Sequence, residues 1–519
     1  MADTKREIER KFEFTHGDGD GGERGGKTGA DGQRRLPDLT GTAGIADVSD
    51  RGTVHLDAVY YDTPDHRLAA DGVTLRRRTG GEDAGWHLKL PVAPGVRDEI
   101  RAPLADTPPR SLTALVRSRV RGAGLEPQVR LGSTREVSHL LDADGNLLAE
   151  LSTDAVRAER GTAVAAWTEV EVELADDVDP ALLDAVEKRF RKAGIRVSDA
   201  PSKLARALAE TGAEPAPAPP AAELPEGTAG AHVLAYLREQ RDALIALDPA
   251  VRLDVPDSVH RMRVATRRLR SALATYRRVL DRTATDPLRD ELRWLAAELG
   301  ADRDREVLLE RLRTHIGELP RTLLHGPVRA RLRTWNAARR SATRRRAVAA
   351  LDSPRHLALL GALDALLADP PLRAPAARTA AGVLPKAVLR DWDRLARRVG
   401  AALALEPGEE RDRALHDARK AAKRARYAAE AAAAALGKPA QRLARAAKSV
   451  QSVLGEHQDG VVAREALHGL ALQAAGAGES AFTWGVLYAR EEGLSARSEQ
   501  QLPDIWSDAD DPRLRAALK

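Results

Sequence analysis

Apolar and polar positions alternate with a period of two through much of the first 210 residues. The clearest segments are Val54–Asp62, Thr74–Arg78, Gly85–Leu90, Val96–Ala102 and Trp167–Leu174. Because successive side chains of a strand point to opposite faces, the pattern predicts β-strands with one polar and one apolar face. Turn-forming residues such as Asp144-Gly145-Asn146 separate them. Helical spacing near Ala181–Ala193 and Ser202–Glu210 predicts two helices that flank the sheet.

From His232 onward the period changes to that of helices, and the sequence becomes rich in Ala, Leu and Arg. The Pro- and Ala-rich run Glu214–Gly230 predicts an extended linker before this half. The Gly-rich, charged run Gly17–Arg35 predicts a disordered loop. We therefore expect a multi-domain α+β protein. Its expected parts are a strand-rich domain at 1–212 with a disordered insert at 17–35, a linker at 213–229 and an all-α domain at 230–510.

The helical half contains an internal duplication. Residues 260–270 match residues 416–426, and the segment 299–304 matches 454–459. The offset between copies is 156 residues for the first pair and 155 for the second. Two separate motifs with one offset indicate a repeated structural unit. We expect two homologous helical bundles with pseudo-twofold symmetry, formed by halves at about 230–370 and 385–510.

Composition narrows the class of protein. The 519 residues are 43% hydrophobic and 3% aromatic, so Leu, Ala and Val must fill the cores. The absence of cysteine excludes disulfides and thiol chemistry. Met1–Phe12 lacks the apolar run of a signal peptide, and later apolar runs are too short for a membrane span. We expect a cytoplasmic protein that contacts no membrane. The net charge of +5 and the many Arg residues fit either phosphate binding or a compositional bias, and the positions of the charges must decide between them.

Charged residues recur on single strand faces, and several of these rows are wholly acidic or mainly basic. Glu169, Glu171 and Glu173 share a face, as do Arg76 and Arg78. Similar rows are Glu7-Glu9-Lys11, His87-Lys89, Arg97-Glu99-Arg101 and Glu150-Ser152-Asp154. Taken strand by strand, a solvated sheet face is the commoner explanation. The sorting of acid from base instead favours a closed tunnel with an acidic and a basic side. Such a tunnel suits a polyphosphate with Mg²⁺ or Mn²⁺.

These residues resemble a known family. Glu7-Ile8-Glu9-Arg10-Lys11 is similar to the ExExK signature that opens CYTH domains, the triphosphate tunnel metalloenzymes. Further resemblances are Tyr60-Tyr61-Asp62-Thr63, Leu75-Arg76-Arg77-Arg78, Trp86-His87-Leu88-Lys89 and Glu169-Val170-Glu171, in the family's order. The similarity runs from about residue 5 to 210. It implies an antiparallel eight-stranded tunnel that hydrolyses inorganic triphosphate or an organic triphosphate such as thiamine triphosphate, while some members make cyclic AMP.

The resemblance also implies roles for individual residues. Glu7 and Glu9 are expected to be catalytic and to help position metal and water. The expected metal ligands are Glu7, Glu9, Asp154, Glu169 and Glu171. The expected phosphate-binding residues are Lys11, Arg76, Arg78, Lys89, Arg97, Arg101, Lys203 and either or both of Arg130 and Arg135, whose inward member the spacing leaves open.

In the helical half, both copies of the repeat carry a basic stripe at helical spacing. The stripes are His260, Arg263, Arg267 and Arg270 in the first copy and His416, Arg419, Lys423 and Arg426 in the second, with Arg268 and Arg424 beside them. A stripe of charge is usually the wet side of a helix. Its duplication favours a cleft filled by anions, since unpaired buried charge is costly. Metal binding by His260 and His416 ranks below phosphate contact, because neither helix has a second ligand at i+4.

The duplicated motifs resemble CHAD domains over roughly residues 228–510. The shared features are the two stripes and the paired Leu-Gly-x-x-x-Asp segments that end at Asp304 and Asp459. The resemblance implies a polyphosphate-binding module with a basic central groove, to which Arg303 and His457 would contribute. Gln458 stands where the first copy has Arg303. The facing of the cluster Arg339, Arg340 and Arg344–Arg346 stays open.

Three functions follow from these patterns. The first is a divalent-metal-dependent triphosphatase with a polyphosphate-binding helical domain. The second is a non-catalytic protein that binds polyphosphate and associates with polyphosphate granules. The third is nucleic-acid binding by the basic helices, which ranks last because the low aromatic content offers few stacking platforms.

Overall fold

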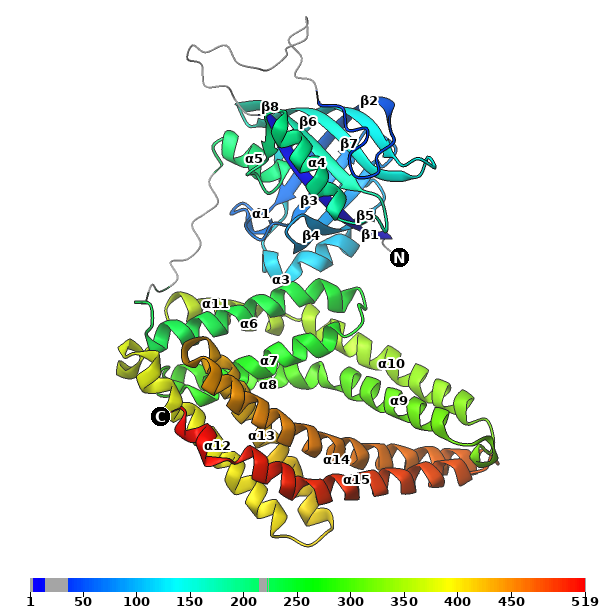
Figure 1. The fold of residues 1–519 in the computed structure, drawn as a ribbon, viewed down its shortest axis with the longest axis vertical. Helices are drawn as coiled ribbons and strands as arrows, with labels where there is room; N and C mark the ends of the chain where they lie inside the picture. The colour runs from blue at the N-terminus through cyan, green and yellow to red at the C-terminus, as the bar shows by residue number, and fades with distance from the viewer. Residues whose placement is uncertain (1–2, 15–35, 214–221, 223, 519) are drawn as a thin grey trace, which may run out of the picture. The chain divides into compact units, whose positions relative to one another are not determined.

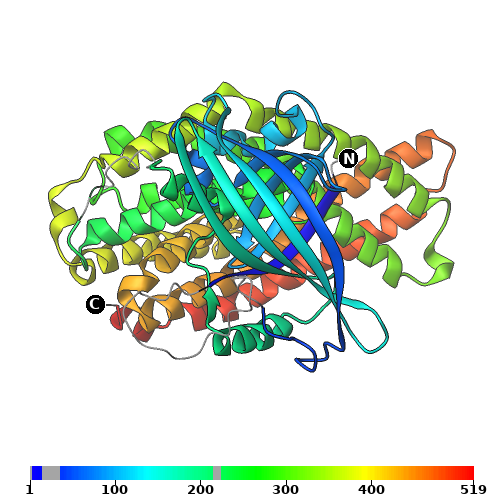
Figure 2. The same ribbon diagram turned by 90° about the horizontal axis from the view of Figure 1, so that it is seen from above.

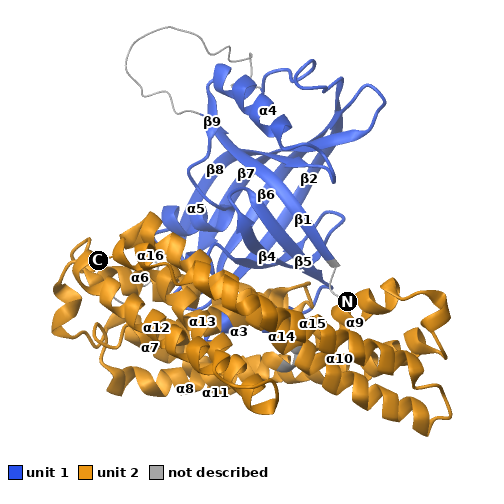
Figure 3. Cartoon of the chain, turned by 60° about the horizontal axis from the view of Figure 1, so that its bottom comes forward, with its two compact units in different colours: residues 1–218 blue, residues 219–519 orange. Residues whose placement is uncertain are grey.

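The computed structural model describes residues 3–14, 36–213, 222 and 224–518, without the side chains of 301–304. The insert expected at 17–35 and most of the linker expected at 213–229 lie outside the described residues. The chain divides into two compact units, Met1–Ala218 and Pro219–Lys519 (Figure 3). The division falls within the Pro-rich run.

The first unit contains an antiparallel sheet that closes into a ring of eight strands (Figures 1 and 2). The strand order is β5-β4-β3-β2-β6-β7-β8-β1, and pairing of β1 with β5 closes the ring. This confirms the eight-stranded tunnel. A short ninth strand pairs with the end of β1. The strands are β1 (Asp3–Phe14), β2 (Asp47–Asp62), β3 (Thr74–Thr79), β4 (Gly85–Ala93), β5 (Val96–Ala102), β6 (Glu126–Leu141), β7 (Leu147–Arg160), β8 (Ala163–Leu174) and β9 (Ile195–Val197).

On one side of the ring, the outer face carries a cluster of apolar side chains, and most of the side chains that line the cavity inside are charged. On β8, Val170 and Val172 are fully buried on the outer face, where helix α4 (Ala181–Lys192) covers them. The ring of Phe190 on α4 meets that of Phe12 on β1 edge to face, with centroids 4.8 Å apart. The period-two pattern therefore places one hydrophobic core outside the barrel, opposite charged groups on the inner face of the same strands.

A second apolar cluster fills part of the barrel interior, because Tyr60, Leu131 and Trp167 stand at inward positions of their strands. Helix α5 (Lys203–Glu210) packs Leu204 and Leu208 against residues of β2, β6, β7 and β8. The side chain of Ser202 accepts a hydrogen bond of 3.0 Å from the amide of Ala205 and so caps this helix. Because the cap fixes where the helix begins, it also fixes the position of Lys203. Short helices α1 (Arg67–Ala70), α2 (Arg110–Thr113) and α3 (Arg117–Val120) complete the unit.

The second unit is all-α, as the sequence predicts. No helix in the described part of the chain is both long enough and apolar enough to cross a membrane. The helices are α6 (Ala229–Arg252), α7 (Ser258–Thr275), α8 (Arg282–Glu298), α9 (Gly300–Glu318), α10 (Val328–Asp352), α11 (Pro354–Ala368), α12 (Ala380–Leu403), α13 (Glu409–Leu436), α14 (Lys438–Gly476), α15 (Phe482–Ala509) and α16 (Pro512–Ala516).

The two repeats pack into common cores. One core combines buried residues of α6, α7 and α8 with residues of α12, α13 and the first part of α14. The other core brings α9 and α10 of the first repeat against the second part of α14 and the start of α15. Each repeat thus supplies part of both cores, so the two related halves share an interior.

Equivalent positions of the two repeats exchange hydrogen bonds at the starts of α6 and α12. The amide of Ala229 donates to the carbonyl of Arg378 at 2.8 Å, and the amide of Ala380 donates to the carbonyl of Gly227 at 2.9 Å. Thr228 and Thr379, the N-cap residues of the two helices, form a bridge between these bonds. Such a reciprocal contact is the mark of a local twofold axis.

Candidate functional site

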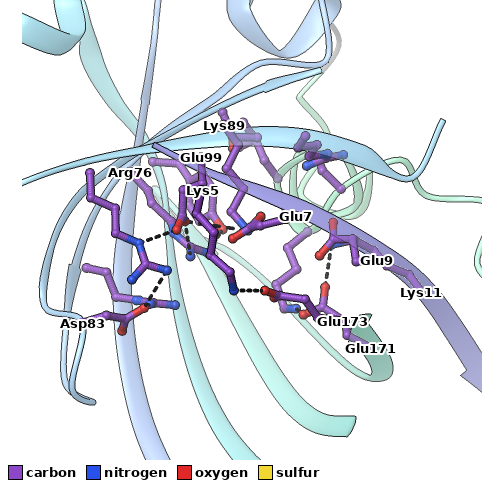
Figure 4. Close-up of a pocket in the computed structure, with 18 of the residues that line it drawn as sticks. Lys5, Glu7, Glu9, Lys11, Arg76, Asp83, Lys89, Glu99, Glu171 and Glu173 are labelled. Carbon is purple, nitrogen blue, oxygen red and sulfur yellow. Dashed lines mark hydrogen bonds and ion pairs between the residues drawn. The ribbon is translucent and has the colours of Figure 1, made fainter. Parts of the chain in front are cut away.

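The barrel encloses a cavity of about 160 Å³ (Figure 4). Among the described residues that line it, only Leu204 is aliphatic, and nine are basic while seven are acidic. The lining residues are Lys5, Glu7, Glu9, Lys11, Tyr60, Thr74, Arg76, Arg78, Asp83, Lys89, Arg97, Glu99, Arg101, Arg135, Glu150, Glu171, Glu173, Ser202, Lys203 and Leu204. The near balance of charge means that the cavity has little surplus positive charge with which to hold a bare polyanion.

Strand β1 contributes Lys5, Glu7, Glu9 and Lys11 to the cavity (Figure 4). Lys89 contacts Glu7 at 2.6 Å, and Lys11 contacts Glu9 at 3.5 Å. Burial raises the pKa of Glu7 above its usual value. Burial acts in the same direction on Glu9, but the positive charges of Lys11, Lys89 and Arg97 together outweigh it and lower the pKa of Glu9. Both acidic residues that the sequence proposes as catalytic therefore face the cavity from adjacent inward positions.

Strands β7 and β8 supply a buried group of three carboxylates, Asp154, Glu169 and Glu171. Lys203 contacts all three, at 3.0, 2.6 and 2.7 Å respectively. The guanidinium of Arg135 on β6 contacts Asp154 at 2.8 Å and Glu171 at 3.0 Å. Burial opposes the charged form of Glu171, but the surrounding cations hold its pKa well below the usual value. This side of the cavity is a compact network in which two cations hold three acids in place.

A second network surrounds Glu99 on β5, whose side chain is 1% exposed. His87 Nδ1 lies 2.9 Å from Glu99 Oε1, and Arg101 Nε donates to Glu99 Oε2 at 2.5 Å. Hydrogen bonding to His87 and nearby Lys89 and Arg76 overcome the effect of burial and lower the pKa of Glu99. Burial lowers the pKa of His87 to about 4. Glu99 thus orders the basic side chains of β3, β4 and β5.

The strand register shows which of Arg130 and Arg135 faces the cavity, a question that the sequence left open. Arg135 lines the cavity, whereas Arg130 does not. Arg130 pairs with Asp57, and its side chain is 60% exposed on the outside of the barrel. The other expected phosphate-binding residues, Lys11, Arg76, Arg78, Lys89, Arg97, Arg101 and Lys203, all line the cavity. Arg97 also donates a hydrogen bond to the carbonyl of Pro201.

The expected division into an acidic and a basic side is only partly present. β8 contributes acids and β3 contributes bases, but β1 and β5 each carry both signs. Sequence reasoning also missed cavity residues as site members. These are Lys5, Tyr60, Asp83, Glu99, Glu150 and Glu173. Strand alternation already placed Glu99, Glu150 and Glu173 on inward rows, whereas Asp83 lies on a turn where alternation gives no signal.

In the second unit, the basic stripes of α7 and α13 approach each other. We call Arg263, Arg267, Arg270, Arg419 and Lys423 the cationic strip; each of these residues is half-buried. Burial and the nearby charges of Arg419, Arg267 and Arg263 lower the pKa of Lys423 to about 7. Burial and neighbouring arginines, including Arg289 and Arg293 of α8, lower the pKa of Arg270. The two α8 arginines were not among the predicted residues.

The duplicated Leu-Gly motif supports the strip in the same way in both repeats. Arg263 donates to the carbonyl of Gly300 at 3.3 Å. A Cβ at Gly300 would lie 3.5 Å from the Arg263 guanidinium, and a Cβ at Gly455 would lie 3.7 Å from that of Arg419. Each glycine therefore lets an arginine rest against a neighbouring helix. Arg419 also lies 3.6 Å from Asp459. The equivalent Asp304 and the candidate Arg303 have side chains outside the described residues.

The remaining residues predicted to bind polyphosphate are held by protein groups. Arg268 and Arg426 both contact Glu430, at 3.1 and 2.6 Å, and Arg424 contacts Asp391 at 2.8 Å. His416 contacts Gln458, and burial lowers its pKa. His260 is half-buried on α7. These side chains lie beside the strip and help to order it.

His457 is not part of the strip. It is 3% exposed, and its Nε2 lies 3.2 Å from both Asp412 and Glu499. It occupies a different face of α14 from Gly455, which packs against Arg419. Helical spacing identifies such a face but not its neighbours, and the structure holds His457 between two acids instead of in the strip.

The arginine cluster of α10 is engaged elsewhere. Arg340 contacts Asp254 at 2.6 Å, and Arg344 contacts the same carboxylate. Arg346 contacts Glu298 at 2.6 Å, and the Arg339 guanidinium lies 4.3 Å from the centre of the Trp335 ring. These contacts tie α10 to its neighbours.

Comparison with known proteins agrees with these two sites. A CYTH domain model matches residues 38–208, and a CHAD domain model matches residues 235–468. MT2285 and Rv2226, from two strains of Mycobacterium tuberculosis, are each 39% identical over 486 residues, which cover 90% of this chain and 92% of the relative. Both are called uncharacterized proteins.

Solved structures also resemble parts of the chain. PptA from Streptomyces chartreusis is 24% identical, with a TM-score of 0.45 over 54% of this chain and 99% of its own. The CHAD domain from the plant Ricinus communis is 27% identical, with a TM-score of 0.40 over 58% of this chain and 95% of its own. With both domain models matched in order and relatives similar along nearly their whole length, the chain belongs to the family of CYTH–CHAD proteins.

Proposed function

We propose that the first unit hydrolyses inorganic triphosphate with the help of Mg²⁺ or Mn²⁺ and that the second unit binds polyphosphate. The observation that carries the first part is the enclosed cavity, in which basic and acidic side chains occur in nearly equal number. A site that only bound an anion would gain nothing from carboxylates. A site that holds both phosphates and metal cations requires both kinds of group.

The donor set fits a divalent cation. Glu7, Glu9 and Glu173 each offer an oxygen atom within 4.8 Å of the others, and so do Asp154, Glu169 and Glu171. Carboxylate oxygens are the ligands that Mg²⁺ and Mn²⁺ prefer. We infer that the first triad holds the metal more readily. Its members contact three separate lysines, Lys89, Lys11 and Lys5, whereas Lys203 alone bridges every member of the second. A bound cation would supply Lewis-acid polarisation of a phosphoryl oxygen.

The protein's own residues would bind and orient the substrate. Arg76, Arg78 and Arg135 line the cavity with guanidinium groups that can hold phosphate oxygens in bidentate fashion. Such cations also neutralise the charge that develops on the transferred phosphoryl group. Glu7 and Glu9 are positioned to orient the attacking water and, through the raised pKa of Glu7, to accept its proton.

The lining favours an inorganic substrate over an organic one. A nucleobase or a thiamine ring needs an apolar or aromatic surface to stack on. Among the described lining residues, Leu204 and Tyr60 are the members that could offer one, and Tyr60 is 3% exposed and in contact with Arg76. We therefore place inorganic triphosphate ahead of thiamine triphosphate and ATP as the substrate.

The cationic strip supports polyphosphate as the ligand of the second unit. Mutual repulsion among its half-buried cations would be relieved by a linear polyanion. Nucleic acid is a weaker candidate, since aromatic residues make up 3% of the chain and stacking platforms are therefore few. Association with polyphosphate granules in the cytoplasm follows from this proposal.

The proposal is tested with purified full-length protein and a phosphate-release panel across triphosphate, thiamine triphosphate, ATP and long polyphosphate, each with Mg²⁺ or Mn²⁺. We expect triphosphate to be the best substrate and Glu9→Gln to lower kcat at least about 100-fold. Glu159→Gln is the matched control, because Glu159 lies on β7 in contact with exposed Arg157 and away from the cavity. Tight binding of phosphate chains without turnover would support the non-catalytic alternative instead.

A further inference from the structure

Asp83 is the one acid among the described cavity-lining residues that does not lie on a strand of the wall. It belongs to the turn between β3, which ends at Thr79, and β4, which begins at Gly85. Its carboxylate contacts Arg78, and it lies 3.9 Å from Arg101 (Figure 4). Asp83 therefore occupies two of the basic side chains that a phosphate chain would use.

The turn is anchored, so Asp83 is held where it is. A Cβ at Gly80, which has φ of +81°, would lie 2.2 Å from the carbonyl oxygen of His55, so the backbones touch there. His87 Nε2 lies 2.9 Å from the carbonyl oxygen of Asp83. Since His87 Nδ1 is fixed by Glu99, the turn is tied to the buried network of the barrel wall.

The strand register places Asp83 at one end of the cavity. Arg101 on β5 lies opposite Asp3 of β1, while Lys11, eight residues further along β1, lies opposite Glu171. Eight residues of a strand span about 26 Å. Lys203 contacts Glu171 and so belongs to the far end. The two ends differ, because a cation is presented at one and an acid on a turn at the other.

We propose that Asp83 limits the length of the phosphate chain that the cavity accepts. This inference rests on the proposed function and names its specificity residue. The carboxylate repels a chain that extends to this end of the cavity, and it competes with phosphate for Arg78 and Arg101. Burial together with Arg76 and Arg135 lowers the pKa of Arg78 to about 9, so this arginine stays charged at neutral pH and is available to an anion once Asp83 is removed.

Asp83→Asn tests the inference with little structural change. The side chain keeps its volume, and the contact to His87 is made by the main chain. We expect kcat/KM for tetraphosphate relative to triphosphate to rise at least tenfold, with Asp83→Ala giving the same direction. Asp57→Asn is the matched control, because Asp57 is also an aspartate in contact with an arginine, Arg130, but on the outside of the barrel.

Binding to full-length protein in buffer that contains Mg²⁺, with phosphate release followed in the same samples, separates this inference from the proposed function. Titration of Asp83→Asn with tri- and tetraphosphate should show the same gain for the longer chain even if no hydrolysis occurs. If tetraphosphate binds more tightly to Asp83→Asn but no variant hydrolyses triphosphate, the proposed triphosphatase activity is rejected. The role of Asp83 in limiting chain length is then retained. An unchanged ratio in both substitutions, or an equal loss for both chains, would overturn the role of Asp83.

Discussion

Lys203 Nζ lies 2.6 Å from Glu169 Oε1 and contacts two further carboxylates in the barrel. The contact joins the first residue of α5 to the inward face of β8. Burial opposes the charge of Lys203, but Glu171, Asp154 and Glu169 together raise its pKa, so the ammonium is charged at all physiological pH values. Together with Arg135, this cation balances the charge of three buried acids.

Lys203→Met should therefore destabilise the first unit at neutral pH. Three buried carboxylates would lose a shared cation, at a cost of about 3 kcal/mol in the free energy of unfolding. Because Mn²⁺ could replace the lost charge, the rise in Tm on adding Mn²⁺ should be larger in this variant than in the wild type. Calorimetry of the full chain measures both quantities. Lys188→Met, at an exposed position on α4, should change neither.

Substitutions at Gly80 and Gly145 separate two effects on stability: the strain of a left-handed backbone and the close contact between the Gly80 turn and His55. Both have φ of +81°, but a Cβ at Gly145 would meet nothing within 4 Å. Gly145→Ala should cost about 1 kcal/mol, the usual price of a left-handed backbone. Gly80→Ala should cost about 3 kcal/mol, because the turn must also move away from His55. Equal losses of stability in thermal unfolding would show that the contact with His55 has no energetic weight.

Polyphosphate binding by the cationic strip should weaken as pH rises above 7. Lys423 has a pKa of about 7 in the free protein, so it is charged below that pH and neutral above it. A bound polyanion favours the charged form and raises the pKa, so binding above pH 7 must include uptake of a proton. Each pH unit above 7 should then weaken binding by up to about tenfold until the pKa of the complex is reached.

Lys423→Arg is the matched variant for this pH dependence, since the first repeat already has Arg267 at the equivalent position. Arginine stays charged, so the affinity of the variant should be nearly constant between pH 6.5 and 9 at fixed salt. Calorimetry in two buffers of different ionisation enthalpy counts the protons taken up. A wild type whose affinity does not change over this range would contradict the assignment to Lys423.

Arg419→Gln should weaken polyphosphate binding and reduce its dependence on salt. Removal of one phosphate contact lowers the slope of log K against log salt by about one. Arg413→Gln, on the same helix, is the control: its side chain is 78% exposed and contacts Glu409. We expect the control to retain the wild-type slope. Equal slopes for all three proteins would place the ligand away from the strip.

Strand alternation predicted most of the inner wall of the barrel. The rows of Glu7 and Glu9, of Arg76 and Arg78, and of Glu169 and Glu171 all point inward because a period of two is a local property of the chain. The sequence also predicted that the first half is strand-rich, that the second is helical and that the second contains a repeat. The spacing of apolar residues and repeated motifs can be recognised without knowledge of tertiary contacts.

The local pattern of residues could not predict site features that depend on contacts between distant parts of the chain. Whether Arg130 or Arg135 faces inward depends on how β6 pairs with β2 and β7, and alternation alone is silent on it. Asp83 lies on a turn, where no period applies. His457 has the correct spacing from its motif, but its partners Asp412 and Glu499 come from two other helices. Each case needed contacts between residues distant in sequence.

The reciprocal bonds between Ala229 and Arg378 and between Ala380 and Gly227 have a consequence for the history of the fold. A single copy of the repeat would expose the apolar surfaces that its counterpart now covers and would leave these amides unmatched. The ancestral gene product, before duplication, would thus have been stable as a pair of identical chains. Separate expression of either half today should yield an aggregate or a homodimer, and mixing both halves should restore a heterodimer.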